Sequence, residues 1–272
     1  MYRATPWLRR LGSLFRATGL QRRLDPAEAT GLALTVALAV IFLAGVGFGL
    51  LAVMVTSRTG LYHYDAGVAA WGSRHATPPA VRTFQVITQL GSTIVVVTEA
   101  TLLGLGDVWR RRTWSGAAFL LTVVLGQNLL SNGVKLLVRR DRPPILPPLH
   151  PGTGYSYPSG HTTAAAATYA AMALLLGRGR RWPVRVWLAV AAAAVTVTIG
   201  LSRVLLGVHW LTDVLGGAML GLGWFTVCAA AFGGRLLRFG APVEQAEAED
   251  ARAGDGDGDG DRRGPAGEGT LR

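Results

Sequence analysis

The apolar residues of this chain fall into six long blocks, which differ from the short periodic stripes of a soluble domain. The blocks run over residues 31–56, 84–106, 114–138, 161–177, 184–207 and 210–232. Most of them reach the roughly 20 residues that a helix needs to cross a bilayer. The fourth block is the shortest, and it spans when the Ser159–Gly160 turn is counted with it. Six apolar blocks separated by short charged loops argue against the alternative, a soluble all-α domain with buried helices. We predict an all-α fold, a polytopic bundle of six transmembrane helices.

The formal charge of +11 would suit a nucleic-acid-binding protein, but the placement of the charge argues against that class. Arginines gather before the first block, between the second and third, between the fourth and fifth, and after the sixth. These are alternate connections, so they all lie on one side of the membrane. By the positive-inside rule this side is the cytoplasm. The pattern predicts a multi-pass protein of the cell membrane with both termini in the cytoplasm, membrane lipids as its surroundings and no nucleic-acid partner.

The flanking segments differ in composition from the apolar blocks. Residues 1–30 form a basic cytoplasmic N-terminal segment, residues 31–238 the six-helix membrane domain, and residues 239–272 a Gly/Asp-rich tail of low complexity that we expect to be disordered in the cytoplasm. In the first outer loop, Leu61, Tyr64, Val68 and Trp71 have the spacing of a short helix at the membrane interface. The second outer loop, 139–158, is rich in proline, which predicts a stiff, non-helical segment.

Unusual polar residues lie at the outer ends of the last four predicted helices. They are Lys135 with Arg139, Arg140, Asp141 and Arg142; Pro158, Ser159, Gly160 and His161; Ser202 and Arg203; and His209 and Asp213. The predicted topology brings all four ends to one extracytoplasmic face. Cations are normally avoided on that face, and ionisable groups at membrane depth indicate function. The active site is therefore predicted at the extracytoplasmic ends of these four helices.

The cations in this cluster suit a phosphate. Arginine makes bidentate contacts to phosphate oxygens, and lysine supplies a point charge. Lys135 is the only lysine among the 27 basic residues, and Asn128, Asn132 and Lys135 share one face of the third helix, which we expect to look inward. The amides of Ser159, Gly160 and His161 open a helix, so they and its dipole are also predicted to point at an anion.

His209 and Asp213 are spaced i, i+4, which would put them on one helical face. The carboxylate could then accept the Nδ1–H of the imidazole, fix its tautomer and leave Nε2 as a nucleophile. A serine hydrolase built on Ser159 is disfavoured because the G-x-S-x-G elbow is missing and three cations are surplus to acyl transfer. A metal hydrolase would need clustered carboxylates and histidines, and Asp141 and Asp213 are too few. No metal or other cofactor is predicted.

Three motifs in order resemble the signature of the type 2 phosphatidic acid phosphatase superfamily, whose soluble relatives are the vanadium haloperoxidases. They are Lys135-x6-Arg142-Pro143, Pro158-Ser159-Gly160-His161, and Ser202-Arg203-x5-His209-x3-Asp213. The resemblance covers residues 135–213, and no motif position departs from the pattern. It implies that Lys135, Arg142 and Arg203 bind phosphate oxygens, with help from Ser159 and the Gly160 amide. It also implies that His209 attacks phosphorus, that Asp213 orients His209, and that His161 protonates the leaving oxygen and then activates water.

The leading expectation is metal-independent hydrolysis of a lipid phosphate or diphosphate through a phosphohistidine. The substrate would be phosphatidate, phosphatidylglycerophosphate or polyprenyl diphosphate. Two alternatives stay open: a lipid phosphotransferase on the same scaffold, and a non-catalytic lipid-binding membrane protein.

Overall fold

The computed structural model describes residues 26–144 and 154–238, and within these ranges the chain is helical, with no strand. The predicted N-terminal segment up to residue 25, the middle of the proline-rich loop and the tail from residue 239 lie outside the described residues. Backbone contacts divide the chain into two units, Met1–Phe232 and Gly233–Arg272. The description below concerns the first unit.

Eight helices make up the described chain. They are α2 (Pro26–Ser57), α3 (Tyr62–Arg74), α4 (Pro78–Gln89), α5 (Thr93–Arg111), α6 (Ser115–Val138), α7 (Gly160–Leu176), α8 (Trp182–Leu205) and α9 (Leu211–Arg238). Four of these, α2, α6, α8 and α9, are long and apolar enough to cross a membrane. A fifth span results if α4 and α5 are counted as one bent span. The all-α class is therefore confirmed. The structure has four or five candidate spans where six were predicted, because α7, with only 17 residues, is too short to be one of them.

The second predicted block is split between two helices rather than forming one. Its first residues end α4, and the rest form α5 after a bend of 44°. At the break, a Cβ on Gly91 would lie 2.9 Å from Ile199 Cγ2 and 3.0 Å from the His161 carbonyl oxygen, so the chain passes close to both α8 and α7. Ser92 then caps α5 by accepting a hydrogen bond from the Val95 amide at 3.4 Å. The bend directs α4 across the end of the bundle.

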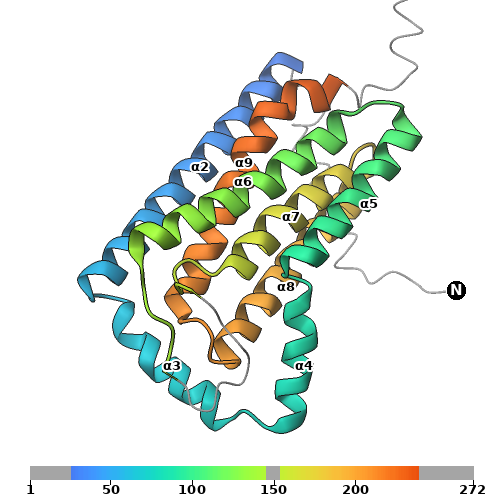
Figure 1. The fold of residues 1–272 in the computed structure, drawn as a ribbon. Helices are drawn as coiled ribbons and strands as arrows, with labels where there is room; N and C mark the ends of the chain where they lie inside the picture. The colour runs from blue at the N-terminus through green and yellow to red at the C-terminus, as the bar shows by residue number, and fades with distance from the viewer. Residues whose placement is uncertain (1–25, 145–153, 239–272) are drawn as a thin grey trace, which may run out of the picture. The chain divides into compact units, whose positions relative to one another are not determined.

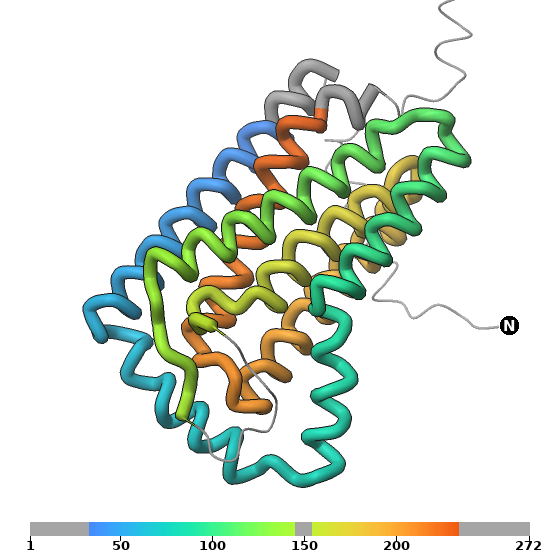
Figure 2. The backbone as a smooth tube through the Cα atoms, viewed as in Figure 1, coloured from blue at the N-terminus to red at the C-terminus, as the bar shows by residue number. Residues whose placement is uncertain are grey.

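Helix α7 lies at the centre of the bundle, beside α5, α6 and α8 (Figures 1 and 2). Most of its buried positions carry small side chains: Thr162, Thr163, Ala164, Ala165, Ala166, Ala167, Thr168 and Ala171. Small residues let neighbouring backbones approach closely, which is the usual basis of helix packing in a membrane. Two glycines of α9 lie very close to the backbone of α7. A Cβ on Gly217 would fall 2.7 Å from the Ser159 carbonyl oxygen, and a Cβ on Gly221 would fall 2.5 Å from the Thr163 carbonyl oxygen.

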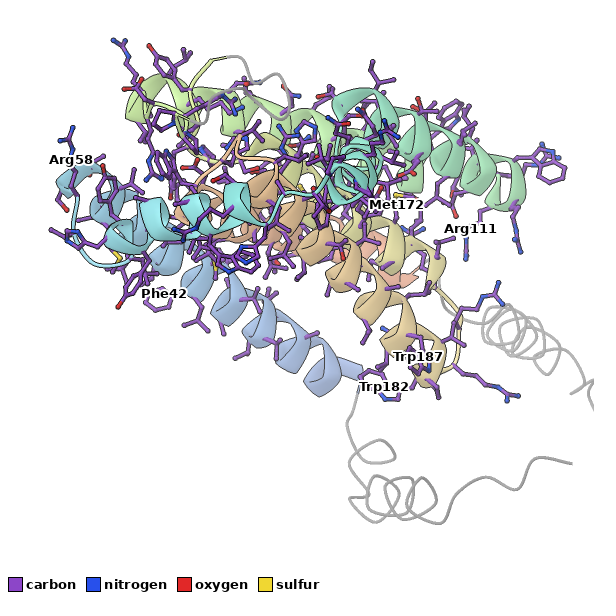
Figure 3. The ribbon with its side chains drawn as sticks, turned by 90° about the horizontal axis from the view of Figure 1, so that it is seen from below. Phe42, Arg58, Arg111, Met172, Trp182 and Trp187 are labelled. Carbon is purple, nitrogen blue, oxygen red and sulfur yellow. The ribbon has the colours of Figure 1, made fainter. Side chains whose placement is uncertain are left out.

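Large apolar side chains cover the outer surface of the helices. Phe42 on α2 is 68% exposed and Trp187 on α8 is 70% exposed, and Figure 3 shows both pointing away from the bundle. The predicted short helix of the first outer loop is present as α3. Its apolar residues Tyr64 and Trp71 are exposed, and its buried residues are Asp65, Ala69 and Gly72. The face of α3 that meets the bundle therefore carries a carboxylate.

The close approach of α9 to α7 generates a stability prediction. Gly221→Ala places a methyl group against backbone atoms of α7, which have little room to shift, so we expect a loss of about 1–3 kcal/mol. The measurement is the thermal unfolding midpoint of purified protein in detergent. Gly49→Ala in α2 is the matched control, because no atom lies within 4 Å of the added Cβ. Equal midpoints for the two variants would show that α7 and α9 are not packed this tightly.

Candidate active site

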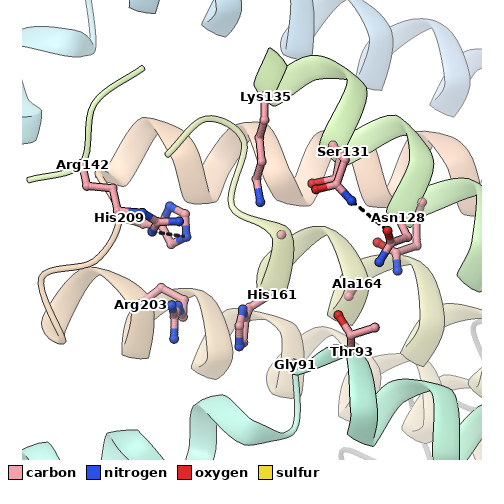
Figure 4. A pocket seen from close by; sticks show the side chains of 13 residues that line it. Gly91, Thr93, Asn128, Ser131, Lys135, Arg142, His161, Ala164, Arg203 and His209 are labelled. Atoms are coloured by element: carbon pink, nitrogen blue, oxygen red, sulfur yellow. Dashed lines mark hydrogen bonds between the residues drawn. The ribbon is translucent and has the colours of Figure 1, made fainter. Parts of the chain in front are cut away.

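Four helix termini meet at the end of the bundle that α3 and α4 border: the ends of α6 and α8 and the beginnings of α7 and α9 (Figure 1). A cavity of about 260 Å³ lies among them. Six predicted site residues line it: Lys135, Arg142, Gly160, His161, Arg203 and His209 (Figure 4). Asp213 and Ser159 lie behind the lining and are fully buried. The convergence expected from the topology is therefore present in the structure.

The two arginines reach the cavity in different ways. Arg142 lies in the segment after α6, where its Nη1 donates to the Val208 carbonyl at 2.8 Å and its Nε to the Gly154 carbonyl at 3.0 Å. Arg203 is in the last turn of α8 and is 3% exposed. Its Nη1 donates to Thr88 Oγ1 of α4 at 3.0 Å, and its buried Nε has no hydrogen-bond partner among the described residues. Because a buried unpaired N–H is costly, Arg203 is suited to an anionic ligand.

Lys135 is the third cation of the cavity, and it lies in the last turn of α6. A Cβ on Gly160 would come within 3.2 Å of its Nζ. The absence of a side chain at Gly160 therefore leaves room for the ammonium group beside the first turn of α7. Cationic side chains and a helix N-terminus thus face the same space, which suits an anion.

His209 and Asp213 form the predicted pair, but not on one helix. His209 lies in the turn between α8 and α9, because α9 begins only at Leu211. Asp213 Oδ2 accepts a hydrogen bond from the Trp210 amide at 3.0 Å, and the same oxygen lies 3.3 Å from His209 Nδ1. The turn therefore closes on the carboxylate. His209 Nε2 is left toward the cavity, 3.3 Å from Arg142 Nη1.

Asp213 is held by Arg140, to which the sequence analysis gave no specific role, and Arg140 is held in turn by Asp65, which the sequence analysis did not single out. Arg140 Nη1 donates to Asp213 Oδ1 at 2.6 Å, and its Nη2 donates to Asp65 Oδ2 of α3 at 2.6 Å. Asp65 also accepts from the Thr212 amide at 3.0 Å. The available signal was the single carboxylate, Asp65, in the predicted interfacial helix of the first outer loop, because a buried aspartate is rare unless it is paired. Arg140 therefore binds the Asp213 carboxylate and does not line the cavity.

Ser159 differs from Gly160 and His161 in what its backbone amide contacts. Its amide donates to the Asp213 carbonyl oxygen at 2.9 Å, so it does not point at a ligand. Its hydroxyl accepts a hydrogen bond from Thr162 Oγ1 at 3.0 Å, and Ser159 does not line the cavity. The reason is the close packing of α7 on the beginning of α9. Only Gly160 and His161 of the predicted amide group lie at the cavity wall.

The surroundings of His209 favour its neutral form. Burial lowers the pKa of its imidazole to about 4, and the charges of Arg203 and Arg142 act in the same direction. The hydrogen bond and negative charge of Asp213 act in the opposite direction and are outweighed. At neutral pH the ring therefore has an unprotonated nitrogen. Its contact with the Asp213 carboxylate assigns the proton to Nδ1 and the lone pair to Nε2.

The described residues contain no group of three or more His, Cys, Asp or Glu side chains that could hold a metal ion. Instead, the cavity offers cations and polar neutral groups. These donors suit an anion such as a phosphate.

Comparison with known proteins agrees with this geometry. The family model described as "PAP2 superfamily" matches residues 116–236, which include every predicted motif residue. Phosphatidylglycerophosphatase B of Bacillus subtilis (strain 168) is 37% identical over 139 residues, covering 50% of this chain and 67% of the relative. A lipid A 1-phosphatase of Rhizobium etli is 35% identical over 127 residues, 43% of this chain, and the match spans only 50% of that relative.

A decaprenylphosphoryl-5-phosphoribose phosphatase of Mycobacterium tuberculosis is 36% identical over 129 residues, covering 46% of this chain and 65% of the relative. Among solved structures, the PAP2 type phosphatidylglycerolphosphate phosphatase from Bacillus subtilis superposes with a TM-score of 0.65. It is 28% identical, and the match covers 72% of this chain and 96% of that one. The chain belongs to the PAP2 superfamily of membrane lipid phosphatases.

Proposed function

We propose that this protein hydrolyses the phosphate ester of a lipid through a phosphohistidine on His209, without a metal ion. The observation that carries the proposal is the position of His209 Nε2. It faces a cavity with three cations, while Nδ1 is held by a buried carboxylate. A neutral imidazole in this setting can attack a phosphorus atom whose oxygens are bound by Lys135, Arg142 and Arg203. A bound phosphate would replace His209 Nε2 as the partner of Arg142 Nη1.

The reaction would proceed in two displacements. In the first, His209 Nε2 forms a bond to phosphorus, the bond to the lipid oxygen breaks, and His161 donates a proton to that oxygen. In the second, His161 accepts a proton from water, the water oxygen bonds to phosphorus, and the bond to Nε2 breaks. The products are a lipid alcohol and inorganic phosphate. General acid–base assistance of this kind contributes about 10²–10⁴ in rate.

Relatives support a lipid substrate. Those named above are a phosphatidylglycerophosphatase, a lipid A 1-phosphatase and a decaprenylphosphoryl-5-phosphoribose phosphatase. We infer that phosphatidate and phosphatidylglycerophosphate are the first substrates to assay. We also infer that the cavity opens on the outer side of the cell membrane and that both termini are cytoplasmic, because the arginine-rich connections lie at the opposite end of the helices.

His209→Ala should abolish turnover, since no covalent intermediate can form, and we expect a loss of about 10³-fold or more. The measurement is rapid-quench formation of acid-labile phosphoenzyme from labelled phosphatidate, in buffer containing EDTA. His75→Ala is the matched control, because His75 is exposed and does not line the cavity. Normal turnover in His209→Ala would contradict the nucleophile assignment, and loss of wild-type activity in EDTA that magnesium restores would contradict the metal-free mechanism.

The low pKa of His209 predicts its titration. The folded-state value of about 4 lies below the ordinary value of about 6.5, so the ring stays neutral as pH falls and is protonated only near pH 4. We expect the ¹⁵N shifts of His209, assigned against His209→Ala in imidazole-labelled protein, to be those of a neutral ring at pH 5.5. Direct titration avoids the ionisation of the substrate phosphate, which falls near pH 6. A ring that is half protonated at pH 6 or above would contradict the effect of burial and the two arginines.

Sidedness can be tested with single cysteines in a Cys228→Ala background. Thr77→Cys lies in the connection between α3 and α4, and Arg110→Cys lies at the far end of α5, and both positions are exposed. We expect a membrane-impermeant maleimide to label Thr77→Cys in intact cells and Arg110→Cys only after permeabilisation. The reverse result would invert the orientation.

A further inference from the structure

The cavity continues past the phosphate-binding cations into a region with no charge. Figure 4 shows His209 and Arg142 at one end, Lys135 and His161 in the middle, and Asn128, Ser131 and Thr93 at the other end. We call the group of Thr93, Asn128, Ser131 and Asn132, all of which line the cavity, the distal subsite. Its side chains offer hydroxyl and amide groups. It is therefore suited to a neutral ligand group that carries hydrogen-bonding oxygens.

The depth of the distal subsite makes these polar side chains unusual. Asn128 lies ten residues before Val138, the last residue of α6, which corresponds to about 15 Å along the helix axis. That distance is about half of a hydrocarbon layer roughly 30 Å thick. Asn132 Nδ2 donates to Asn128 Oδ1 at 2.8 Å, whereas the buried Ser131 Oγ has no hydrogen-bond partner among the described residues. A buried hydroxyl without a partner is costly, so a ligand that supplies one would be stabilised.

The direction of the proposed reaction assigns this region to the leaving group, and this step rests on the proposed function. In an in-line displacement the attacking and leaving atoms lie on opposite sides of phosphorus. His209 is at one end of the cavity, so the leaving oxygen points to the other end, past His161 (Figure 4). From Lys135 to Asn128 that direction runs along α6 into the membrane. The body of a lipid substrate must lie there.

The rim of the distal subsite offers a path for hydrocarbon chains. Helices α5 and α6 are joined by a short connection at one end and diverge toward the other, as Figures 1 and 2 show. Thr93 and Asn132, at the open end of this pair, are exposed. Ile94, next to Thr93 in sequence, is 80% exposed, and Leu129, next to Asn128, is 76% exposed. Polar groups at the lip, with apolar side chains next to them, match the polar and apolar parts of one lipid.

We propose that the distal subsite binds the hydroxyl- and ester-bearing carrier of the phosphate, a glycerol or sugar unit, and that the lipid tails leave between α5 and α6. This selects against polyprenyl monophosphates, whose carbon chain follows directly on the phosphate and would give the buried Ser131 hydroxyl no partner. It also selects against diphosphates. Lys135, Arg142 and Arg203 line the cavity and would bind the first phosphate, and none of them belongs to the distal subsite.

The test is the ratio of kcat/KM for phosphatidate to kcat/KM for farnesyl phosphate, measured in detergent micelles. We expect wild type to favour phosphatidate and the ratio to fall about tenfold in Asn128→Leu, because a site built to hydrogen-bond its substrate loses that discrimination when the polar group is removed. Ser131→Ala, a smaller change, should lower the ratio in the same direction. Thr122→Val is the matched control on α6: its hydroxyl bonds to the Ala118 carbonyl at 2.8 Å and does not line the cavity, so the ratio should stay at the wild-type value.

An unchanged ratio in both Asn128→Leu and Ser131→Ala, or a wild-type enzyme that prefers farnesyl phosphate, would overturn the assignment of the distal subsite. If Asn128→Leu does not fold, Ser131→Ala alone decides. Phosphoenzyme formation and p-nitrophenyl phosphate hydrolysis by the wild type separate this failure from failure of the proposed function. If both occur and the ratio does not respond, only the distal subsite is wrong; if neither occurs, the phosphohistidine mechanism itself is wrong.

Discussion

The end of the bundle that holds the candidate active site depends on one buried cation, Arg140, which lies between two buried carboxylates. Its guanidinium donates to Asp65 and Asp213 at 2.6 Å each, and the three side chains are 8%, 2% and 0% exposed, respectively. The rings of Tyr62 and Trp210 each lie 5.2 Å from its central carbon, which adds cation–π contacts. Removing one member would leave a buried charge without its partner, which typically costs about 3–5 kcal/mol. The group joins α3, the segment after α6 and the beginning of α9.

Asp213 connects Arg140 to His209, the proposed nucleophile, because its two carboxylate oxygens have different partners. Oδ1 is bound by Arg140, so Oδ2 remains for the Trp210 amide and for His209 Nδ1. Its backbone carbonyl accepts the Ser159 amide, which sets the position of α7. The orientation of His209 and the placement of Gly160 and His161 therefore both depend on Asp213. A carboxylate with a single partner could rotate, and it would define the tautomer and direction of the imidazole less well.

The sequence predicted which residues would meet, because alternating helices fix which ends share a face. Lys135, Arg203 and His209 gather for that reason. It did not predict how the neighbouring arginines divide their tasks. Arg139 ends α6 with a positive φ of 49° and bonds to the Leu136 carbonyl, whereas Arg140 turns inward to Asp65, 75 residues away in the chain. Such choices depend on how the chain reverses after α6 and on contacts across the bundle, which local spacing does not contain.

In the proposed mechanism, the same groups would bind the phosphate and keep the nucleophile unprotonated. Arg142 and Arg203 would bind the phosphate oxygens of the substrate. When no substrate is bound, the charges of these two arginines help keep the pKa of His209 low. A bound phosphate dianion offsets these charges, so the local field that disfavours a proton on Nε2 weakens as the substrate arrives. By then, however, Nε2 would face phosphorus and be closed off from water. In the proposed mechanism the imidazole is thus unprotonated before binding for electrostatic reasons and would stay so afterwards for steric ones, while Asp213 would stabilise the positive charge that develops on the ring during attack.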